Sequence, residues 1–365
     1  MTNSRIHGLA AAGVSVWSDQ ISRSMLDTGE LATRIERDAV TGVTSNPTIF
    51  AGAIVGSSDY DEQLRDLKSG GAPTEEIAKS LMAADIQRGC ELLLGVFHSS
   101  GGRDGFVSVE VSPTLAGESQ ATVAEARDWV KQISRPNLLV KVPATAEGVP
   151  AIRDLIAEGI SVNITLIFSL DRYVEVIEAY LSGLEDFHAA GGDLSTIASV
   201  ASFFVSRFDT EVDPRLEELG SEEALALRGV TAIANARVAY GLFQKHFESD
   251  RFQALAAEGA SVQRPLWAST STKNPDYPDL MYVDGLVAPD SVNTMPLATI
   301  DAYQDHGDPS PPAFTAEDIE NAKQDLERLG SIGIDYQEVV RVLEDEGVEK
   351  FTKSWLELLE RVEQA

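Results

Sequence analysis

The sequence predicts an α/β fold, a single closed (β/α)8 TIM barrel, from two observations. Short apolar runs rich in β-branched residues alternate along the chain with longer helical patterns, as expected for βα units and a parallel sheet. Eight such runs are present, which suits a closed barrel. The alternative is an open doubly wound sheet, which usually has fewer strands and a glycine-rich first turn. The sequence contains neither G-x-G-x-x-G nor G-x-x-x-x-G-K-[ST].

Each expected strand is a short apolar run. Parallel strands buried on both faces are almost continuously apolar, and Leu138–Val140 and Ile164–Phe168 follow that pattern. In chain order the eight expected strands are Val14–Trp17, Gly42–Ser45, Phe106–Val111, Leu138–Val142, Ser161–Phe168, Ile197–Val205, Pro265–Ala268 and Met281–Val287.

Helical patterns fill the intervals between these runs. The main ones are Thr74–His98, Ala121–Ile133, Val149–Ala157, Leu170–Ala190 and Ser221–Phe247. After a proline-rich stretch at 308–312, Thr315 is a candidate N-cap, because acidic residues follow it in the first turn. We expect the tail, about residues 313–365, to be helical and to pack on the barrel, so that residues 1–365 form one domain.

Composition excludes several classes of function. The 29 basic and 58 acidic residues give a net charge of −29, which disfavours nucleic acids and anionic membrane surfaces. The single cysteine, Cys90, excludes an internal disulfide and a cysteine-based structural zinc site, and it fits a reducing cytoplasm. The apolar run Leu9–Trp17 is short for a signal peptide, and no run of about 18 apolar residues predicts a transmembrane helix. We therefore expect a cytoplasmic protein.

Barrel enzymes carry their catalytic residues at the C-terminal ends of the strands, so the candidates in this sequence are the residues at those positions. The five histidines form no H-E-x-x-H pair or close cluster, so a catalytic zinc is not expected. The residues at the expected strand ends are Asp19, Thr44, Asn46, Glu110, Lys141, Asn163, Thr165, Ser202, Phe204, Arg207, Ser269 and Lys273.

Lys141 is the most informative of these residues, because it stands inside an apolar strand. Burying an ammonium group is unfavourable unless the charge is lost or paired. A neutral amine is a nucleophile toward carbonyl groups, so one interpretation is a Schiff-base lysine. The other is a strand-end lysine whose stem packs in the barrel while its amine reaches water.

Asp19 and Glu110 could shuttle protons in Schiff-base chemistry, at the carbinolamine and at a substrate hydroxyl. Either could equally cap a helix or pair with an arginine. The Ser/Thr-rich segment 269–273, with Lys273 and Arg207, indicates a phosphate site, because loops after the seventh strand of a barrel often bind phosphate. A polar surface loop is the alternative there.

Three segments together resemble the transaldolase family, in its longer bacterial form. Residues 42–50 (GVTSNPTIF) are similar to the family's T-[ST]-N-P segment. Residues 138–148 (LLVKVPATAEG) are similar to its K-[IVL]-P-[AG]-T-x-E-G signature, and residues 161–169 (SVNITLIFS) to its N-[IVL]-T-L-[IL]-F-S segment. The resemblance extends from about Trp17 to Tyr303.

The resemblance implies a barrel enzyme without metal or cofactor that moves a dihydroxyacetone unit between sugar phosphates. The donor would be sedoheptulose 7-phosphate or fructose 6-phosphate, and the acceptor glyceraldehyde 3-phosphate or erythrose 4-phosphate, in the non-oxidative pentose phosphate pathway. Its partners would be these small molecules, and the chain would be a monomer or a homodimer. Two alternatives are a fructose 6-phosphate aldolase, which releases free dihydroxyacetone, and an inert barrel that only binds sugar phosphates.

The resemblance also implies a role for each candidate residue. Lys141 forms the Schiff base, and Asp19 takes the hydroxyl proton as the carbon–carbon bond breaks. Glu110, with Thr165, holds the water used for proton transfer. The other implied substrate contacts are Asn46 and Asn163 at the dihydroxyacetone unit, Ser202 and Phe204 in the pocket wall, and Arg207 and Ser269 at the phosphate. Thr44 is a further expected substrate-binding residue. Lys273 stands approximately where shorter relatives have an arginine.

Overall fold

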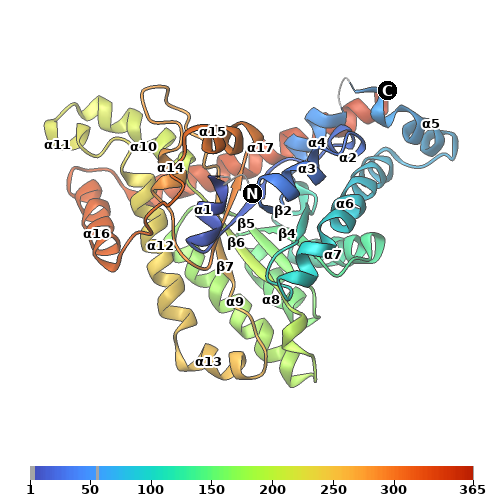
Figure 1. The fold of residues 1–365 in the computed structure, drawn as a ribbon, viewed down its shortest axis with the longest axis horizontal. Helices are drawn as coiled ribbons and strands as arrows, with labels where there is room; N and C mark the ends of the chain where they lie inside the picture. Colours follow the sequence, from blue (N-terminus) through green and yellow to red (C-terminus); the bar gives the residue numbers. More distant parts are fainter. Residues whose placement is uncertain (1–4, 55–56, 365) are drawn as a thin grey trace.

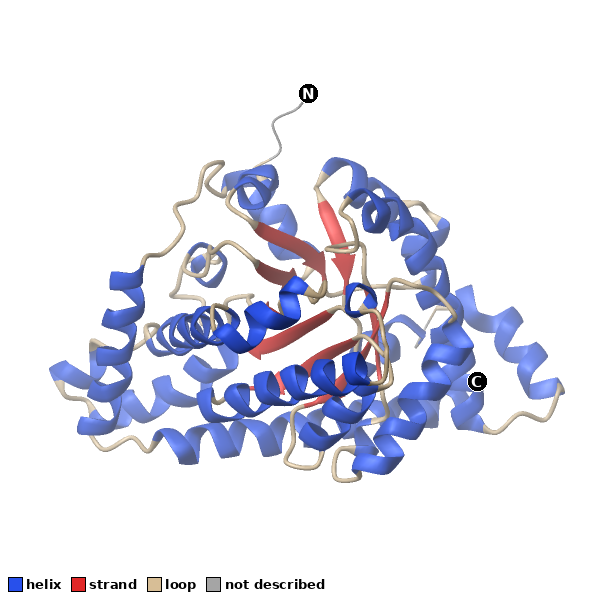
Figure 2. Cartoon of the chain, turned by 90° about the horizontal axis from the view of Figure 1, so that it is seen from below, coloured by secondary structure: helices blue, strands red, loops and turns tan. Residues whose placement is uncertain are grey.

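The computed structural model describes residues 5–54 and 57–364. Eight parallel strands form a closed barrel in which each strand pairs with the next and the last pairs with the first. Figure 2 shows the strands at the centre with helices around them. The strands are β1 Val14–Ser18, β2 Val40–Val43, β3 Val107–Glu110, β4 Leu138–Pro143, β5 Val162–Ile167, β6 Ser199–Phe204, β7 Arg264–Ala268 and β8 Ser291–Met295.

Helices connect and cover the strands (Figure 1). The α-helices before β6 are α1 Ile6–Ala11, α2 Arg23–Asp27, α3 Glu30–Arg37, α4 Pro47–Ile54, α5 Asp61–Ser69, α6 Thr74–Ser99, α7 Ser119–Ile133, α8 Gly148–Ala157 and α9 Leu170–Ala189. Those after β6 are α10 Ser206–Leu219, α11 Glu222–Leu225, α12 Thr231–Phe247, α13 Asp250–Ala257, α14 Met281–Asp284, α15 Leu297–His306, α16 Ala316–Ser331 and α17 Tyr336–Gln364. Short 3-10 turns lie at Ser58–Tyr60, Pro113–Leu115 and Leu194–Thr196.

The structure confirms the closed barrel and seven of the eight expected strands, with ends shifted by at most two residues. The eighth prediction is wrong. Met281–Val287 forms helix α14 and the turn after it, and the last strand is Ser291–Met295. A short apolar run fits a buried helical turn as well as a strand. In the structure, Tyr282 and Val283 are buried side chains of α14.

The true eighth strand was missed because polar side chains interrupt it. Asn293 accepts a hydrogen bond from Thr270, 2.8 Å between Oδ1 and Oγ1. Thr294 shares a 2.7 Å hydrogen bond with Thr44 between their Oγ1 atoms. These groups are satisfied by partners in the segments that follow β2 and β7, and sequence periodicity does not reveal such partners.

Two helical predictions were refined by the structure. The pattern at Ser221–Phe247 divides into α11 and α12, and Gly229 between them has φ +68°, which glycine adopts readily. The N-cap at Thr315 is confirmed, since its Oγ1 accepts from Asp318 N while the Asp318 carboxylate accepts from Thr315 N.

Helix α17 crosses one end of the barrel (Figure 1) and contacts α4, α6, α10 and β5. Gly347 lets it approach the end of β5 closely. A Cβ atom at position 347 would lie 3.1 Å from Cδ2 of Leu166 and 3.4 Å from Cε2 of Phe168. The single-domain arrangement over the whole chain stays a prediction. Within the described residues, none of the helices is both long and apolar enough to cross a membrane.

Candidate active site

A cavity of about 160 Å³ opens at the C-terminal ends of the strands. Ten of the twelve residues singled out from the sequence line it. They are Asp19, Thr44, Asn46, Lys141, Thr165, Ser202, Phe204, Arg207, Ser269 and Lys273. The other two, Glu110 and Asn163, are buried beside this cavity and contact residues that line it. The barrel therefore gathers side chains that are up to 254 residues apart in the chain.

Lys141 projects into the cavity from β4. Its Nζ atom donates one hydrogen bond to Glu110 Oε2 and another to the Ser45 carbonyl oxygen, both at 3.0 Å. Lys141 is only 5% exposed, so its amine does not extend into bulk water as the strand-end alternative requires. An amine held inside a cavity in this way is positioned to attack the carbonyl carbon of a molecule that enters the cavity.

Glu110 is paired with Lys141 by the register of β3 and β4, which sets the two residues directly opposite each other. Burial raises the pKa of the Glu110 carboxyl above its ordinary value, and the positive charges of Lys141 and Arg207 oppose that rise. A carboxyl whose pKa is raised takes and returns protons more readily near neutral pH.

Asp19 follows β1 and faces the same cavity. Burial raises its pKa to about 6, although Lys273 and Lys141 pull it down. Among the described residues, Asp19 Oδ1 has no hydrogen-bond partner. A buried carboxylate oxygen is normally hydrogen-bonded, so this oxygen is available to a hydroxyl group in the cavity.

Strand β5 carries Thr165 and Asn163. Thr165 Oγ1 is buried and has no partner within the described part of the chain. Asn163 is already engaged, since its Nδ2 donates to Ser108 Oγ at 3.0 Å and its Oδ1 accepts from Ser202 Oγ at 2.7 Å. One amide hydrogen of Asn163 remains for another acceptor.

The backbone of β5 is irregular next to Thr165. The pairing of β5 with β6 shifts in register between Ile164 and Ile167. Leu166 lies in this interval with φ +60°, the left-handed region that a branched side chain rarely adopts. Bulges of this kind re-aim a side chain near active sites, and strained residues of this type cluster there.

The segment after β2 supplies Thr44 and Asn46. Asn46 Oδ1 accepts from Ile49 N at 3.0 Å, which caps the start of α4. This bond fixes the amide and leaves its Nδ2 group to donate. Thr44 is held by its hydrogen bond to Thr294. The T-S-N-P segment thus both starts a helix and presents donors to the cavity.

Arg207 lies at the outer side of the cavity, between two aromatic rings. Its guanidinium carbon is 5.0 Å from the centre of the Phe204 ring and 5.8 Å from that of Phe351. Burial lowers its pKa, while Glu346 and Glu110 raise it. Arg207 forms no ion pair or hydrogen bond with any residue in the described ranges. The guanidinium is therefore held in place by packing and keeps its donors free for an anion.

Ser269 and Lys273 complete this outer side. Ser269 follows β7 with φ +57°, and its Oγ lies 2.9 Å from Ser206 Oγ. Lys273 Nζ donates to Ser271 Oγ. Burial lowers the Lys273 pKa, as do the neighbouring cations Lys350 and Arg207, whereas Asp19 raises it. The loop after β7 therefore brings a hydroxyl and a cation next to Arg207.

Sequence reasoning missed several residues of the cavity wall. Thr294 lies in the strand that was misplaced, and Pro296 follows it directly. Ser271 lies in the Ser/Thr-rich segment 269–273 but was not singled out within it. Phe351 comes from α17, which was expected only to pack on the barrel. Lys141 Nζ lies 5.9 Å from the centre of the Phe351 ring. No sequence signal distinguishes this phenylalanine from an ordinary core residue of a helix.

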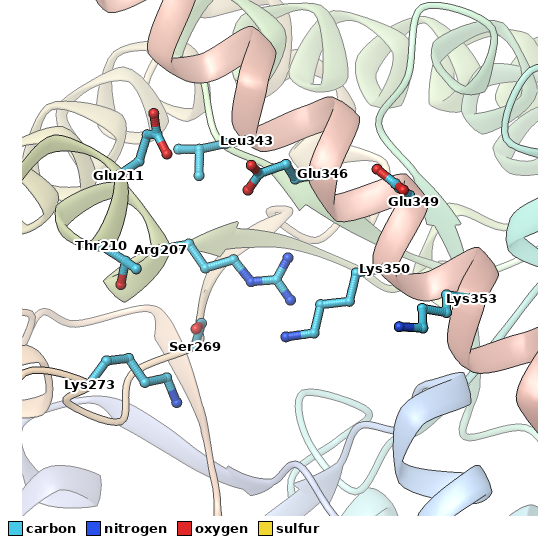
Figure 3. A pocket seen from close by; sticks show the side chains of 10 residues that line it. All are labelled: Arg207, Thr210, Glu211, Ser269, Lys273, Leu343, Glu346, Glu349, Lys350 and Lys353. Carbon is cyan, nitrogen blue, oxygen red and sulfur yellow. The ribbon is translucent and has the colours of Figure 1, made fainter. Parts of the chain in front are cut away.

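A second, larger cavity of about 670 Å³ adjoins the first, and the two share Arg207, Ser269 and Lys273. Its other wall is α17 (Figure 3). Within residues 5–54 and 57–364, no group of three or more His, Cys, Asp or Glu side chains is arranged to hold a metal ion.

Fold and site together define a (β/α)8-barrel enzyme with a buried lysine amine at the C-terminal end of the barrel. The chain belongs to the transaldolase/fructose-6-phosphate aldolase family, whose model matches residues 16–362. It is 53% identical over 365 residues to a transaldolase of Thermobifida fusca, covering 99% of this chain and 98% of that protein. It is 52% identical to a transaldolase of Frankia alni (98% and 96% covered) and 51% identical to one of Mycolicibacterium smegmatis (98% and 96%).

Proposed function

We propose that this protein is a transaldolase that transfers a dihydroxyacetone unit between sugar phosphates through a Schiff base on Lys141. The donor is sedoheptulose 7-phosphate or fructose 6-phosphate, and the acceptor is glyceraldehyde 3-phosphate or erythrose 4-phosphate. The observation that carries the proposal is the buried Lys141 amine, held 3.0 Å from the Glu110 carboxylate in a cavity that Asp19 also lines.

In the donor half-reaction, the Lys141 amine adds to the ketone carbon and gives a carbinolamine. Loss of water then leaves a protonated imine. Glu110, through a water positioned by Thr165, delivers and removes the protons of these steps. The raised pKa of Glu110 supports this role, because a carboxyl must change its protonation state during the cycle.

Carbon–carbon cleavage needs a base for the hydroxyl proton and a sink for electrons. Asp19 takes the proton, the bond breaks, and its electron pair moves into the imine to form an enamine. The aldose phosphate leaves. In the acceptor half-reaction the enamine attacks the new aldehyde, the oxygen formed takes the proton back from Asp19, and hydrolysis of the imine frees Lys141. A pKa of about 6 suits Asp19 to both directions.

The outer cations hold the phosphate group away from the reacting carbons. Arg207, Ser269 and Lys273 contribute donors to one side of the cavity, and Asn46, Asn163 and Ser202 contact the dihydroxyacetone hydroxyls. Binding energy from a phosphate that takes no part in the chemistry orients the reacting carbons. The low cysteine content and acidic composition further support a cytoplasmic enzyme that binds small molecules rather than nucleic acids or membranes.

A second candidate is a fructose 6-phosphate aldolase, because the family that the chain belongs to includes such enzymes. Such an enzyme protonates the enamine and releases free dihydroxyacetone. Glu110 favours transfer, since simple aldolases of this superfamily commonly differ at that position. An inert sugar-phosphate-binding barrel is the third possibility, and it predicts binding without an imine.

Borohydride trapping tests the proposal. The protein is incubated with fructose 6-phosphate, reduced, and analysed by mass spectrometry and peptide mapping. We expect a dihydroxyacetone-sized adduct on Lys141 and none in Lys141→Met. Adding erythrose or glyceraldehyde phosphate before reduction should discharge the adduct into a new sugar phosphate. Release of free dihydroxyacetone instead would identify an aldolase, and sugar binding without an adduct would identify the inert barrel.

A further inference from the structure

The larger cavity has an unusual concentration of positive charge for so acidic a chain. Four cationic side chains line it, Arg207 and Lys273 from the barrel and Lys350 and Lys353 from α17. Figure 3 shows Arg207, Lys273 and Lys350 extending toward the same space, with Lys353 beyond Lys350 along the helix. In a protein with a net charge of −29, four cations that gather at one cavity indicate an anionic ligand.

The two lysines of α17 are free although carboxylates lie one turn away. Glu346 and Glu349 precede Lys350 and Lys353 by four residues, which is the spacing and order that favour an ion pair on a helix. Neither lysine forms an ion pair within the described residues. On the same helix, Arg341 and Asp345 do pair at this spacing, at 3.2 Å. The Lys350 amine extends instead toward Arg207 (Figure 3).

The acidic residues of the cavity do not cancel this charge. Three glutamates contribute to the lining, but Glu211 is bound by Arg215, with 2.5 Å between Oε1 and Nη2. Of the three lining glutamates, Glu346 and Glu349 therefore remain to balance the charge of the four lining cations. Lys350 lies close enough to lower the pKa of Lys273, and two amines that repel each other in this way are both stabilised by an anion placed between them.

The position of Lys350 is fixed by the packing of α17. Gly347 and Phe351 flank Lys350 on the helix, and both are buried, Gly347 against Leu166 and Phe351 against Lys141 and Arg207. Because residues three and four apart on a helix share a face, these contacts fix the rotation of α17 about its axis. Lys350 is then held at the edge of the reaction cavity, on the side where Arg207 lies.

We propose that Lys350 is a phosphate-binding residue supplied by the C-terminal helix, which makes α17 part of the substrate site rather than a cover for the barrel. Lys350 donates to the phosphate of the sugar substrate together with Lys273 and Arg207. This inference rests on the proposed function for the identity of the ligand. Lys353, one turn further along α17, contributes a weaker, long-range attraction.

Inorganic phosphate is the probe that separates this proposal from the catalytic one, because its binding needs no Schiff base. Calorimetric titration compares the full-length wild type with Lys350→Ala, Lys353→Ala and Lys245→Ala. Lys245 is an exposed lysine of α12 that does not line the cavity. Its replacement changes the net charge by the same amount as Lys350→Ala but leaves the cavity unchanged. We expect the dissociation constant for phosphate to rise about tenfold in Lys350→Ala, as for one charge-assisted hydrogen bond, less in Lys353→Ala, and not in Lys245→Ala.

The same variants are then compared in transfer assays with glyceraldehyde 3-phosphate and with unphosphorylated glyceraldehyde as acceptors. For Lys350→Ala we expect KM to rise for the phosphorylated acceptor, with a much smaller change for glyceraldehyde. Lys350→Arg should recover most of the affinity. Failure of phosphate to bind the wild type, or equal binding by wild type and Lys350→Ala, would overturn the proposal. Phosphate binding that depends on Lys350 in a chain that forms no imine would overturn only the proposed function.

Discussion

Nζ of Lys141 lies 3.0 Å from Oε2 of Glu110, and both side chains are almost completely buried. The two residues are 31 positions apart and meet because β3 and β4 pair with these residues directly opposite each other. A buried ion pair is weak support for stability, since both charges lose their hydration. Its presence beside the cavity is better explained by chemistry, because it keeps the amine in contact with the proposed proton carrier.

Lys141→Arg should abolish turnover. The guanidinium keeps the positive charge next to Glu110, but it does not deprotonate and so cannot act as a nucleophile toward a carbonyl. Steady-state transfer from fructose 6-phosphate to an aldose phosphate measures the effect, with Lys245→Arg as the control for the same exchange at the surface. Substantial remaining activity in Lys141→Arg would refute the Schiff-base role.

Glu110→Gln should slow formation and hydrolysis of the imine more than carbon–carbon cleavage. Glutamine keeps the size of the side chain and an acceptor for Lys141 but cannot exchange a proton, and loss of a general acid–base typically slows a step by about 10²–10⁴-fold. Rapid-quench trapping with borohydride follows adduct formation directly. Equal slowing of both steps would instead indicate that Glu110 only positions Lys141.

Asp19→Asn should allow the imine to form but slow the cleavage step. The ionised form of Asp19 is the base, and its pKa is raised to about 6. The cleavage rate should therefore fall as pH decreases through about 6, and this limb of the pH profile should vanish in Asp19→Asn. Single-turnover release of the aldose phosphate across this range is the measurement. An unchanged cleavage rate in the variant would contradict the assignment.

Gly347→Val should destabilise the protein and reduce its activity. The added side chain would meet Leu166 and Phe168 at the end of β5, so α17 would have to move outward, at an overpacking cost of about 1–3 kcal/mol. Phe351 would move with it. Gly95→Ala in α6 is the matched control, since nothing lies within 4 Å of its Cβ position, and there we expect a gain of about 0.5–1 kcal/mol. Thermal unfolding and kcat/KM together test the effect, and an unchanged Tm in Gly347→Val would refute it.

Asp209→Asn should make stability less dependent on pH. Burial, aided by Asp213, raises the Asp209 pKa to about 6, so the fold favours the protonated carboxyl. This stability is complete below the ordinary value of 3.8 and is lost as pH rises through about 6. The amide keeps an acceptor for Thr231 Oγ1 and Ala232 N and can donate to the Tyr282 hydroxyl.

Relative to wild type, the free energy of unfolding of Asp209→Asn should therefore rise by up to about 3 kcal/mol between pH 4 and pH 7. That amount corresponds to a pKa that is about 2 higher in the folded than in the unfolded protein. Denaturant unfolding at several pH values provides the measurement. Asp276→Asn, at an exposed position, is the control variant. A constant difference between Asp209→Asn and wild type across this range would show that Asp209 does not titrate there.

The sequence by itself determined the barrel, seven of its strands and the set of residues at the strand ends. Parallel strands buried on both faces are almost continuously apolar, and Leu138–Val140 and Ile164–Phe168 show that pattern in the sequence. Once the barrel closes, Asp19, Lys141 and Arg207 must gather at one end, since the carboxyl ends of all eight strands meet there.

Only the tertiary structure decided the last strand and the position of α17. Thr294 is tolerated in β8 because Thr44, which follows β2 and lies 250 residues away in the sequence, hydrogen-bonds to its hydroxyl. In the sequence, Glu346 and Lys350 have the spacing of an ordinary Glu–Lys ion pair on a helix surface. The Lys350 amine faces Arg207 because Gly347 and Phe351 fix how the helix lies on the barrel. Local periodicity shows which face of a helix is apolar, but not which distant surface that face will meet, because that depends on packing across the whole fold.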